Sequence, residues 1–194
     1  MTPQSPVITT ERLILRPLRP SDADDLLQYQ SHADTVRYIP WPQRTRQQVI
    51  EALEKHASEA SEHPEATGEF ALLAWELRET RQVIGQGNLG IVRASNRHAE
   101  IGWVTHPKFV RQGFALEATV ALLDWAFGGL GLHRVTAAID RRNQASARLA
   151  ERLGMRCEAE HIDDDWFKGE WTSTLVYAIL ASEWRSPSPV APIP

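Results

Sequence analysis

The stretch EIGWVTHPKFVRQGFALEAT, residues 100–119, decides the fold of this chain. It begins inside an apolar run, His98–Thr105, that is typical of a strand, and from Ala115 it continues as an amphipathic helix. Between them lies a loop with one glycine, Gly113. Such a loop presents consecutive backbone N–H groups at the positive end of a helix dipole, and glycine lets an anion approach the backbone. The junction therefore predicts an anion site suited to a pyrophosphate.

A second strand-to-helix junction lies in residues 140–155, DRRNQASARLAERLGM. Asn143 is placed to cap the helix, Ser146 follows one turn later, and Gly154 is a typical helix stop. Taken alone, this pattern is accounted for by an N-cap and a helix end. The two junctions in this order are much less common by chance, so we treat them as one functional pattern.

Apolar runs and turn signals around these junctions predict the order of strands and helices. Thr45 and Gln48 have the spacing of a capping box at a helix start, and the middle of the chain has the pattern of an antiparallel meander. The expected fold is α/β (α+β), one domain with a mixed, mostly antiparallel central sheet of about six to seven strands, flanking helices and a late β-α-β crossover. The predicted strands are residues 12–18, 69–77, 82–92, 98–105, 133–139, 157–161 and 172–180, and the predicted helices are residues 21–29, 45–62, 115–127 and 143–153.

Length and charge exclude several classes of protein. The chain has 194 residues, with 21 Lys+Arg against 25 Asp+Glu and a formal net charge of −4. We expect one domain, with a core of about residues 8–182 and flexible tails at 1–7 and at the proline-rich 186–194. Mild acidity argues against direct nucleic-acid binding. We find no secretory signal and no apolar run of about 18–20 residues, so we expect a cytoplasmic protein without a membrane partner.

Other patterns are better explained by structure than by chemistry. Residues 85–90, GQGNLG, match the dinucleotide fingerprint, but a strand follows instead of a helix, so we expect glycines that permit close backbone approach. Cys157 is the one cysteine, which excludes an intramolecular disulfide, and we expect a buried, inert thiol. The histidines lack metal-ligand spacing and the acidic run 163–165 is expected to be a solvated turn, so we expect no metal.

Several short motifs occur in order along the chain. They are TERLILR at residues 10–16, EIGW at 100–103, the loop from Pro107 to GFA at 113–115 with EA at 117–118, N-x-x-S at 143–146, and LGM at 153–155. On these motifs the chain resembles, from about residue 8 to 182, the GNAT superfamily of acetyl-CoA-dependent N-acetyltransferases. Within it, the chain resembles the RimJ/RimL type, which acetylates protein N-terminal amines, ribosomal proteins among them. It departs from the family pattern at Val110, where Gln or Arg is usual, at Ser173, where Asp is common, and in a last helix without tyrosine.

The resemblance implies direct attack of an amine on the acetyl thioester in a ternary complex, with acetyl-CoA as co-substrate and no metal. An α-amine has an ordinary pKa of about 8, so a weak base suffices. Glu100 would act as that base through water, with the acidic residues 163–165 as rivals. A strand carboxylate paired with a nearby cation is the alternative for Glu100. Asn143 would bind the cofactor arm, Ser146 would protonate or hydrogen-bond the leaving sulfur, and the backbone near Val104 would polarise the thioester carbonyl.

The implied contacts come from several parts of the chain. Arg111, Arg141, Arg142 and Arg148 form a basic cluster around the expected ends of the cofactor, where charges near a phosphorylated nucleotide are favourable. The implied cofactor-binding set is Val104, Thr105, Arg111, Gln112, Gly113, Phe114, Ala115, Asn143 and Ser146, and the implied substrate-binding set is Tyr38, Trp41 and Trp166.

The acceptor is expected to be an amine, and by resemblance the N-terminal amine of a protein or peptide. Two alternatives stay open. One is a small amine such as an amino acid, a polyamine or an antibiotic. The other is a module that binds acyl-CoA without turnover. A homodimer is also left open by the sequence.

Overall fold

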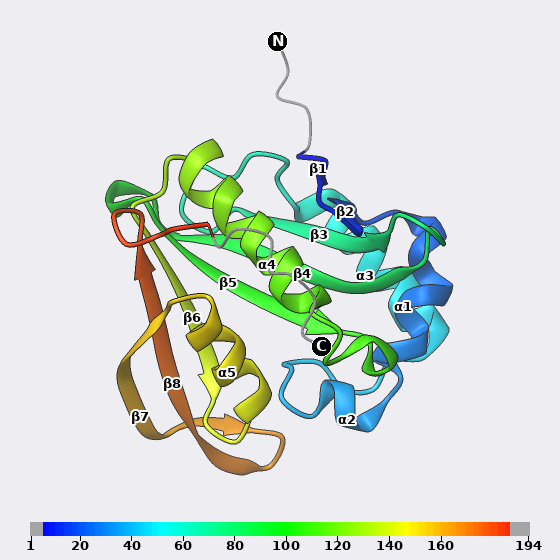
Figure 1. The fold of residues 1–194 in the computed structure, drawn as a ribbon. Coiled ribbons are helices and arrows are strands. Elements are labelled where there is room, and N and C mark those ends of the chain that lie inside the picture. The colour runs from blue at the N-terminus through cyan, green and yellow to red at the C-terminus, as the bar shows by residue number, and fades with distance from the viewer. Residues whose placement is uncertain (1–5, 187–194) are drawn as a thin grey trace.

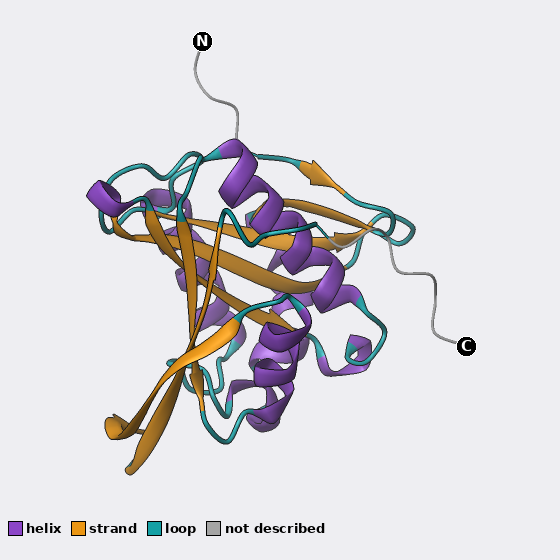
Figure 2. Ribbon diagram, turned by 60° about the vertical axis from the view of Figure 1, so that its left-hand side comes forward, coloured by secondary structure: helices purple, strands orange, loops and turns teal. Residues whose placement is uncertain are grey.

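The computed structural model describes residues 6–186, so the predicted tails lie outside the described residues except for residues 6, 7 and 186. An open sheet of eight strands, in the order β1-β2-β3-β4-β5-β6-β8-β7, carries helices on both faces (Figures 1 and 2). The predicted class, a single mixed α+β domain, is confirmed. The predicted six to seven strands are too few, because residues 8 and 9 form a two-residue strand that is too short to leave a sequence pattern.

The predicted order of elements is otherwise observed, with small differences at their ends. The strands are β1 (Ile8–Thr9), β2 (Leu13–Pro17), β3 (Phe70–Leu77), β4 (Val83–Arg93), β5 (His98–Thr105), β6 (Arg134–Asp140), β7 (Arg156–Phe167) and β8 (Glu170–Leu180), and the helices are α1 (Ala23–Gln30), α2 (Ala33–Val36), α3 (Arg46–Glu59), α4 (Phe114–Asp124) and α5 (Gln144–Arg152).

The helix α3 begins as the capping box predicts. The Thr45 side chain accepts from the backbone N–H of Gln48, and the Gln48 side chain accepts from the backbone N–H of Thr45. The one-turn helix α2 was not predicted, because four residues are too few to show helical periodicity.

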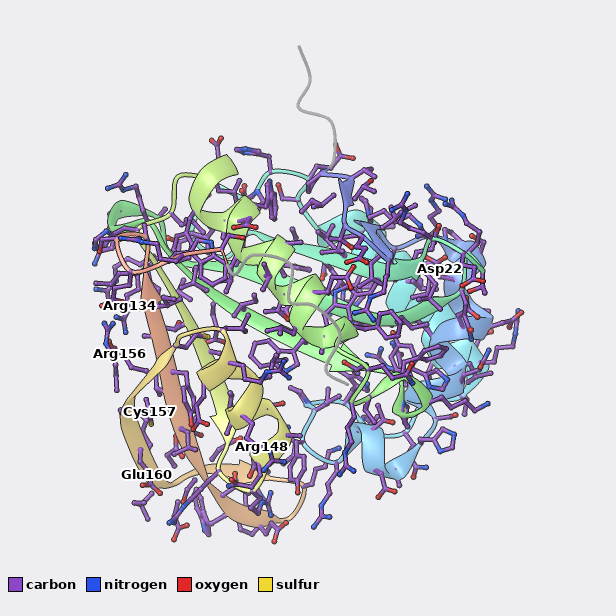
Figure 3. All side chains as sticks on the ribbon, viewed as in Figure 1. Asp22, Arg134, Arg148, Arg156, Cys157 and Glu160 are labelled. Atoms are coloured by element: carbon purple, nitrogen blue, oxygen red, sulfur yellow. The ribbon has the colours of Figure 1, made fainter. Side chains whose placement is uncertain are left out.

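The strand β7 differs most from expectation. It runs through the acidic residues 163–165, which were expected to form a turn, and the chain reverses later, at Lys168 and Gly169. Both of these residues have positive φ, 52° and 90°, as a two-residue hairpin turn requires. Cys157 is exposed on β7, at the edge of the sheet (Figure 3), so the expectation of a buried thiol is wrong. An edge strand carries no further layer over its side chains here, and sequence alone does not identify edges.

Two apolar clusters hold the helices on opposite faces of the sheet. The larger cluster packs α4 and α5 against the strands and includes Leu15, Trp75 and Leu122. The smaller cluster packs α1 and α3 on the other face, through residues such as Tyr29 and Val49. In Figure 1, α4 and α5 lie in front of the sheet and α3 lies behind it. The centre of the sheet is therefore walled by helices on both sides.

The glycines of β4 are structural, as expected. A Cβ on Gly85 would lie 2.5 Å from the ring of Trp75, and one on Gly87 would lie 3.2 Å from the same indole. Trp75 is fully buried, so its ring is accommodated on β4 only because these positions have no side chain. No helix starts within the motif, which excludes the dinucleotide-binding arrangement.

A buried ion network joins the first two long strands to the turn before α1. The guanidinium of Arg16 makes two hydrogen bonds of 2.8 Å to the carboxylate of Asp22 and one of 2.5 Å from Nε to Glu76. All three residues are nearly inaccessible, at 4%, 4% and 2% exposure. Arg81 adds a second positive charge, since its Nε lies 2.7 Å from Glu76 Oε1. The charges of the network therefore balance, and removing one partner would leave an uncompensated charge in the interior, which is much costlier than losing an exposed pair.

Asp22→Ala is expected to lower the free energy of unfolding by about 3–5 kcal/mol, because Arg16 would stay buried with half of its partners. Urea denaturation measures this. Asp24→Ala is the matched control, since Asp24 forms an exposed ion pair with Arg46, and its loss should cost about 1 kcal/mol or less. Equal effects of the two substitutions would contradict the network's role.

Candidate active site

The centre of the site is a gap between two parallel strands. β5 and β6 pair at only three positions, His98 with Arg134, Ala99 with Val135 and Glu100 with Thr136. Beyond these pairs, β5 stays hydrogen-bonded to β4 and β6 stays hydrogen-bonded to β8. Each strand therefore has partners for its backbone N–H and C=O groups only on the side that faces away from the gap. The inner backbone N–H and C=O groups of the diverging segments are left without strand partners.

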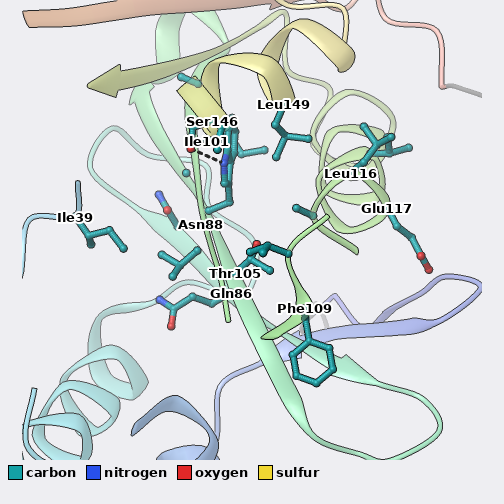
Figure 4. A pocket seen from close by; sticks show the side chains of 18 of the residues that line it. Ile39, Gln86, Asn88, Ile101, Thr105, Phe109, Leu116, Glu117, Ser146 and Leu149 are labelled. Atoms are coloured by element: carbon teal, nitrogen blue, oxygen red, sulfur yellow. Dashed lines mark hydrogen bonds between the residues drawn. The ribbon is translucent and has the colours of Figure 1, made fainter. Parts of the chain in front are cut away.

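A cleft of about 2010 Å³ opens at this gap. Its walls include residues 100–105 of β5, residues 137–140 of β6 and the first turns of α4 and α5 (Figure 4). An elongated molecule with amide groups would find free backbone donors and acceptors along β5, as an added strand would. The predicted residues Val104 and Thr105 both line this wall.

The predicted anion loop lies at one end of the cleft. Gly113 is the N-cap of α4 and has φ = +85°, a left-handed backbone conformation that residues other than glycine rarely adopt. The first N–H groups of α4 have no partner within the helix, and the helix dipole adds positive potential at the same point. Arg111, Gln112, Gly113 and Ala115 all line the cleft here.

Glu117 would weaken this positive potential if it stood alone in the first turn of α4. It is held instead by the N-terminal segment, because its carboxylate accepts from the Thr10 hydroxyl at 2.6 Å and from Arg12 Nε at 2.7 Å. Arg12 also donates to the carbonyl oxygen of Gln112, at 3.0 Å. Thr10 and Arg12 therefore neutralise the carboxylate of Glu117, fix the start of α4 in place and leave its positive potential available to an anion.

One predicted cofactor residue does not reach the cleft. Phe114 is 8% exposed and is absent from the cleft lining; its ring lies under the guanidinium of Arg12, at 4.3 Å, and against Phe109. Only its backbone N–H, at the helix start, is available to a ligand. The sequence placed Phe114 in the loop, with the helix beginning at Ala115, but α4 begins one residue earlier, at Phe114, and its side chain turns into the protein.

The second junction lies across the cleft, at the start of α5. The Oδ1 atom of Asn143 accepts from the backbone N–H of Ser146 at 3.1 Å, so Asn143 caps the helix and its amide nitrogen alone is left for a ligand. The Oγ atom of Ser146 accepts from Trp103 Nε1 at 3.2 Å. An indole nitrogen only donates, so the Ser146 hydroxyl hydrogen is free to point elsewhere in the cleft.

Glu100 lies where the two strands begin to separate. Its side chain lines the cleft and, within the described residues, makes no ion pair and no hydrogen bond. Surrounding protein atoms partly desolvate the carboxyl and raise its pKa above the ordinary value. The alternative of a strand carboxylate paired with a cation is therefore not observed. The rival residues 163–165 lie on the exposed strand β7, away from the cleft lining.

The predicted substrate-binding residues divide into two groups. Tyr38 and Trp41 line the cleft in the segment between α2 and α3, with Asp34 and His56 nearby in the lining. Trp166 is absent from the lining and packs edge-to-face against Trp171 on the β7–β8 hairpin, with ring centroids 5.3 Å apart. The structure therefore does not bring Trp166 to this site.

The predicted basic cluster is only partly free to bind an anion. Arg141 pairs with Glu160, and Arg142 pairs with both Asp140 and Glu170. Arg111 and Arg148 line the cleft without an ion pair in the described part of the chain; Figure 3 labels Arg148 on α5. These two arginines remain the candidates for contact with a phosphorylated nucleotide.

Sequence reasoning missed several residues that line the cleft. Gln86 and Asn88 stand two residues apart in the apolar strand β4, so they share one face, and that spacing was the available signal. Trp103 was quoted within a motif but given no role. No group of three or more His, Cys, Asp or Glu among residues 6–186 could hold a metal ion, and no helix in that range is long and apolar enough to cross a membrane.

Known proteins resemble this chain over nearly its whole length. An uncharacterised N-acetyltransferase of Bacillus subtilis, YnaD, is 30% identical over 185 residues, which cover 92% of this chain and 99% of that protein. The spermidine N(1)-acetyltransferase of Escherichia coli is 24% identical over 88% of this chain and 87% of its own. The crystal structure of a GNAT-family acetyltransferase from Bacillus anthracis superimposes with a TM-score of 0.82 at 28% identity, covering 92% of this chain and all of that one.

The family model of the GNAT acetyltransferase domain matches residues 12–156. That range contains the diverging strands β5 and β6, the loop before α4 and the whole of α5. Because the match covers well over half of the chain, this protein belongs to the GNAT family and is an acyl-CoA N-acyltransferase.

Proposed function

We propose that this N-acetyltransferase acts on the N-terminal α-amine of a protein or peptide, as enzymes of the RimJ/RimL type do. The observation that carries the proposal is Glu100, an unpaired carboxyl in the cleft with a raised pKa. A carboxyl is a weak base even when its pKa is raised. It suits an α-amine, whose pKa is about 8, better than an alkyl amine, whose pKa is about 10.4.

The residues present fit acetyl-CoA as the co-substrate. The free N–H groups at the start of α4 would hold the pyrophosphate, since Gly113 leaves the backbone open there. The unpaired inner edge of β5, with Val104 and Thr105, would bond the amide groups of the pantetheine arm. Asn143 would add its amide nitrogen from the other side of the cleft.

Two side chains would move protons during transfer of the acetyl group, which the co-substrate supplies as a thioester. Glu100 would accept a proton from the amine through water, which leaves the nitrogen lone pair free to attack. Ser146 would pass its hydroxyl proton to the departing thiolate and regain a proton, through water, from the newly acylated nitrogen; Trp103 already occupies an acceptor position on Oγ, which leaves the hydroxyl hydrogen free for this transfer. The backbone near Val104 would polarise the thioester carbonyl.

A small polycationic amine is the second candidate. Asp34 and Glu100 both line the cleft, and two carboxylates would attract a ligand with two ammonium groups. The relationship to a spermidine acetyltransferase adds weight to this candidate.

Acetylation of a mixed panel decides between the two acceptors. The panel contains peptides with free N-termini, the same peptides with blocked N-termini, spermidine and putrescine, and release of free CoA thiol is measured. We expect turnover of free N-termini above that of the polyamines. Turnover of polyamines alone would overturn the proposal in favour of the second candidate.

Gly113→Ala is expected to weaken acetyl-CoA binding at least about tenfold, because a left-handed non-glycine residue costs about 1–2 kcal/mol and would distort the loop. Isothermal calorimetry measures the affinity. The matched control is Gly131→Ala, which replaces another left-handed glycine, away from the cleft lining and with nothing within 4 Å of the new Cβ. Equal affinities in the two variants would contradict the assignment of the loop.

Glu100→Gln is expected to lower kcat by about a hundredfold or more, the usual contribution of a positioned base. In the unmodified protein kcat/KM should fall as pH drops through the raised pKa of Glu100, and the variant should lose that acid limb. A rate and pH profile unchanged by the substitution would exclude Glu100 as base.

The stability of the same variant is the control. A raised carboxyl pKa in the folded state means that ionised Glu100 opposes folding above that pKa, and that this penalty disappears at acid pH. Glu100→Gln should therefore be at least as stable as the unmodified protein at pH 7, so its loss of activity would not reflect unfolding.

A further inference from the structure

A chain of hydrogen bonds runs behind the side of the cleft that α1 and α3 cover, where the proposed function places the amine substrate. Arg44 Nη1 donates to Gln30 Oε1 at 2.9 Å, and Gln30 Nε2 donates to Gln86 Oε1 at 3.1 Å. The hydroxyl of Tyr29 donates to the same Gln86 oxygen, also at 3.1 Å. Tyr29, Gln30 and Gln86 are between 0% and 5% exposed, so bulk water does not compete for the bonds among these three residues; the bond from Arg44 is partly buried.

Arg44 sets the direction of the whole chain of bonds. A guanidinium can donate but cannot accept, so the atom of Gln30 that faces Arg44 must be the amide oxygen. The amide nitrogen of Gln30 then faces Gln86, and the atom of Gln86 that receives it must again be an oxygen. Burial raises the pKa of Tyr29 far above its ordinary value, so its hydroxyl stays protonated and can donate as well.

The amide nitrogen of Gln86 is consequently turned away from this chain of bonds. Gln86 lines the cleft, and its nitrogen has no acceptor among the described residues and is not among their fully buried polar atoms. In Figure 4 the Gln86 amide extends from its strand into the space opposite Ile39. Two N–H donors are therefore held ready for a ligand.

Gln86 shares one face of the sheet with the proposed base. In the β4–β5 ladder Gln86 lies opposite Val104, Asn88 opposite Gly102 and Gly90 opposite Glu100. Residues directly opposite one another share a face, and positions two apart along a strand do too. The two donors of Gln86 and the carboxyl of Glu100 therefore address the same side of the cleft, the side of α1 and α3.

We propose that Gln86 determines acceptor specificity by donating a hydrogen bond to a backbone carbonyl oxygen of a peptide acceptor. This deepens the proposed function and rests on it, since it places the acceptor in the same cleft. A peptide offers a carbonyl oxygen close to its amine, whereas a polyamine offers only further N–H donors. Amide N–H groups fixed in this direction attract the carbonyl oxygen of a peptide and repel the N–H donors of a polyamine.

Gln86→Glu tests the proposal, because it replaces the cleft-facing donors with an acceptor and keeps the size and an oxygen for Tyr29 and Gln30. We expect kcat/KM for a short peptide, divided by that for spermidine, to fall about ten- to a hundredfold. The affinity for acetyl-CoA should stay unchanged. Gln82→Glu, just before β4 and outside the cleft lining, is the control and should leave the ratio as it is.

Peptide binding in the presence of CoA, measured by calorimetry, separates this proposal from the proposed function. A peptide that binds without being acetylated, and binds more weakly to Gln86→Glu, would overturn the proposed function and support the role of Gln86. A peptide that is acetylated with an unchanged ratio in the variant would overturn the role of Gln86 alone. Acetylation and binding of polyamines only would overturn both.

A second pair of variants keeps the test valid if Gln86→Glu does not fold. Arg44→Lys retains a group that only donates and should keep the orientation of both amides. Arg44→Gln introduces an amide that can accept, which releases Gln30 and Gln86 to turn round. We expect the peptide preference to be lost in Arg44→Gln and retained in Arg44→Lys; equal preferences would contradict the directional argument.

Discussion

The site depends on the early divergence of two parallel strands. β5 and β6 share three residue pairs and then separate, while β4 and β8 hold them from outside. A sheet cannot close such a gap itself, because each backbone is already fixed by its other neighbour. The backbone N–H and C=O groups on the unpaired inner edges can form hydrogen bonds with the amide groups of a ligand. The helices α4 and α5 then place their N-terminal ends along the same opening.

Groups that can only donate decide what the polar side chains of the cleft offer. The indole of Trp103 uses an acceptor position of Ser146 and leaves its hydrogen free, and the guanidinium of Arg44 turns the Gln86 amide nitrogen to the cleft. In both cases a cleft side chain that can both donate and accept is oriented by a neighbour that can only donate. Side chains with both donors and acceptors acquire a single role only because such a neighbour fixes them.

The motifs near the N-terminus acquire a physical meaning in the same way. Thr10 and Arg12 hold the carboxylate of Glu117, which lies in the first turn of α4, more than a hundred residues along the chain. Arg16 joins β2 and β3 to the turn before α1 through hydrogen bonds to the buried carboxylates of Asp22 and Glu76. These contacts were invisible as pairs in the sequence, since charge and spacing do not say which distant carboxylate an arginine meets.

The sequence by itself determined the fold class and the strand-to-helix junctions at Gly113 and Asn143, because turn chemistry and apolar periodicity act over a few neighbouring residues. The family was indicated by resemblance alone, through short motifs spread along the chain. Only the tertiary structure decided that Gln86 and Trp103 belong to the cleft, that Phe114 and Trp166 do not line it, and that Cys157 is exposed. The face on which a side chain lies, and what covers it, depends on strands that are distant in sequence. A local sequence pattern does not indicate which distant strands become those neighbours.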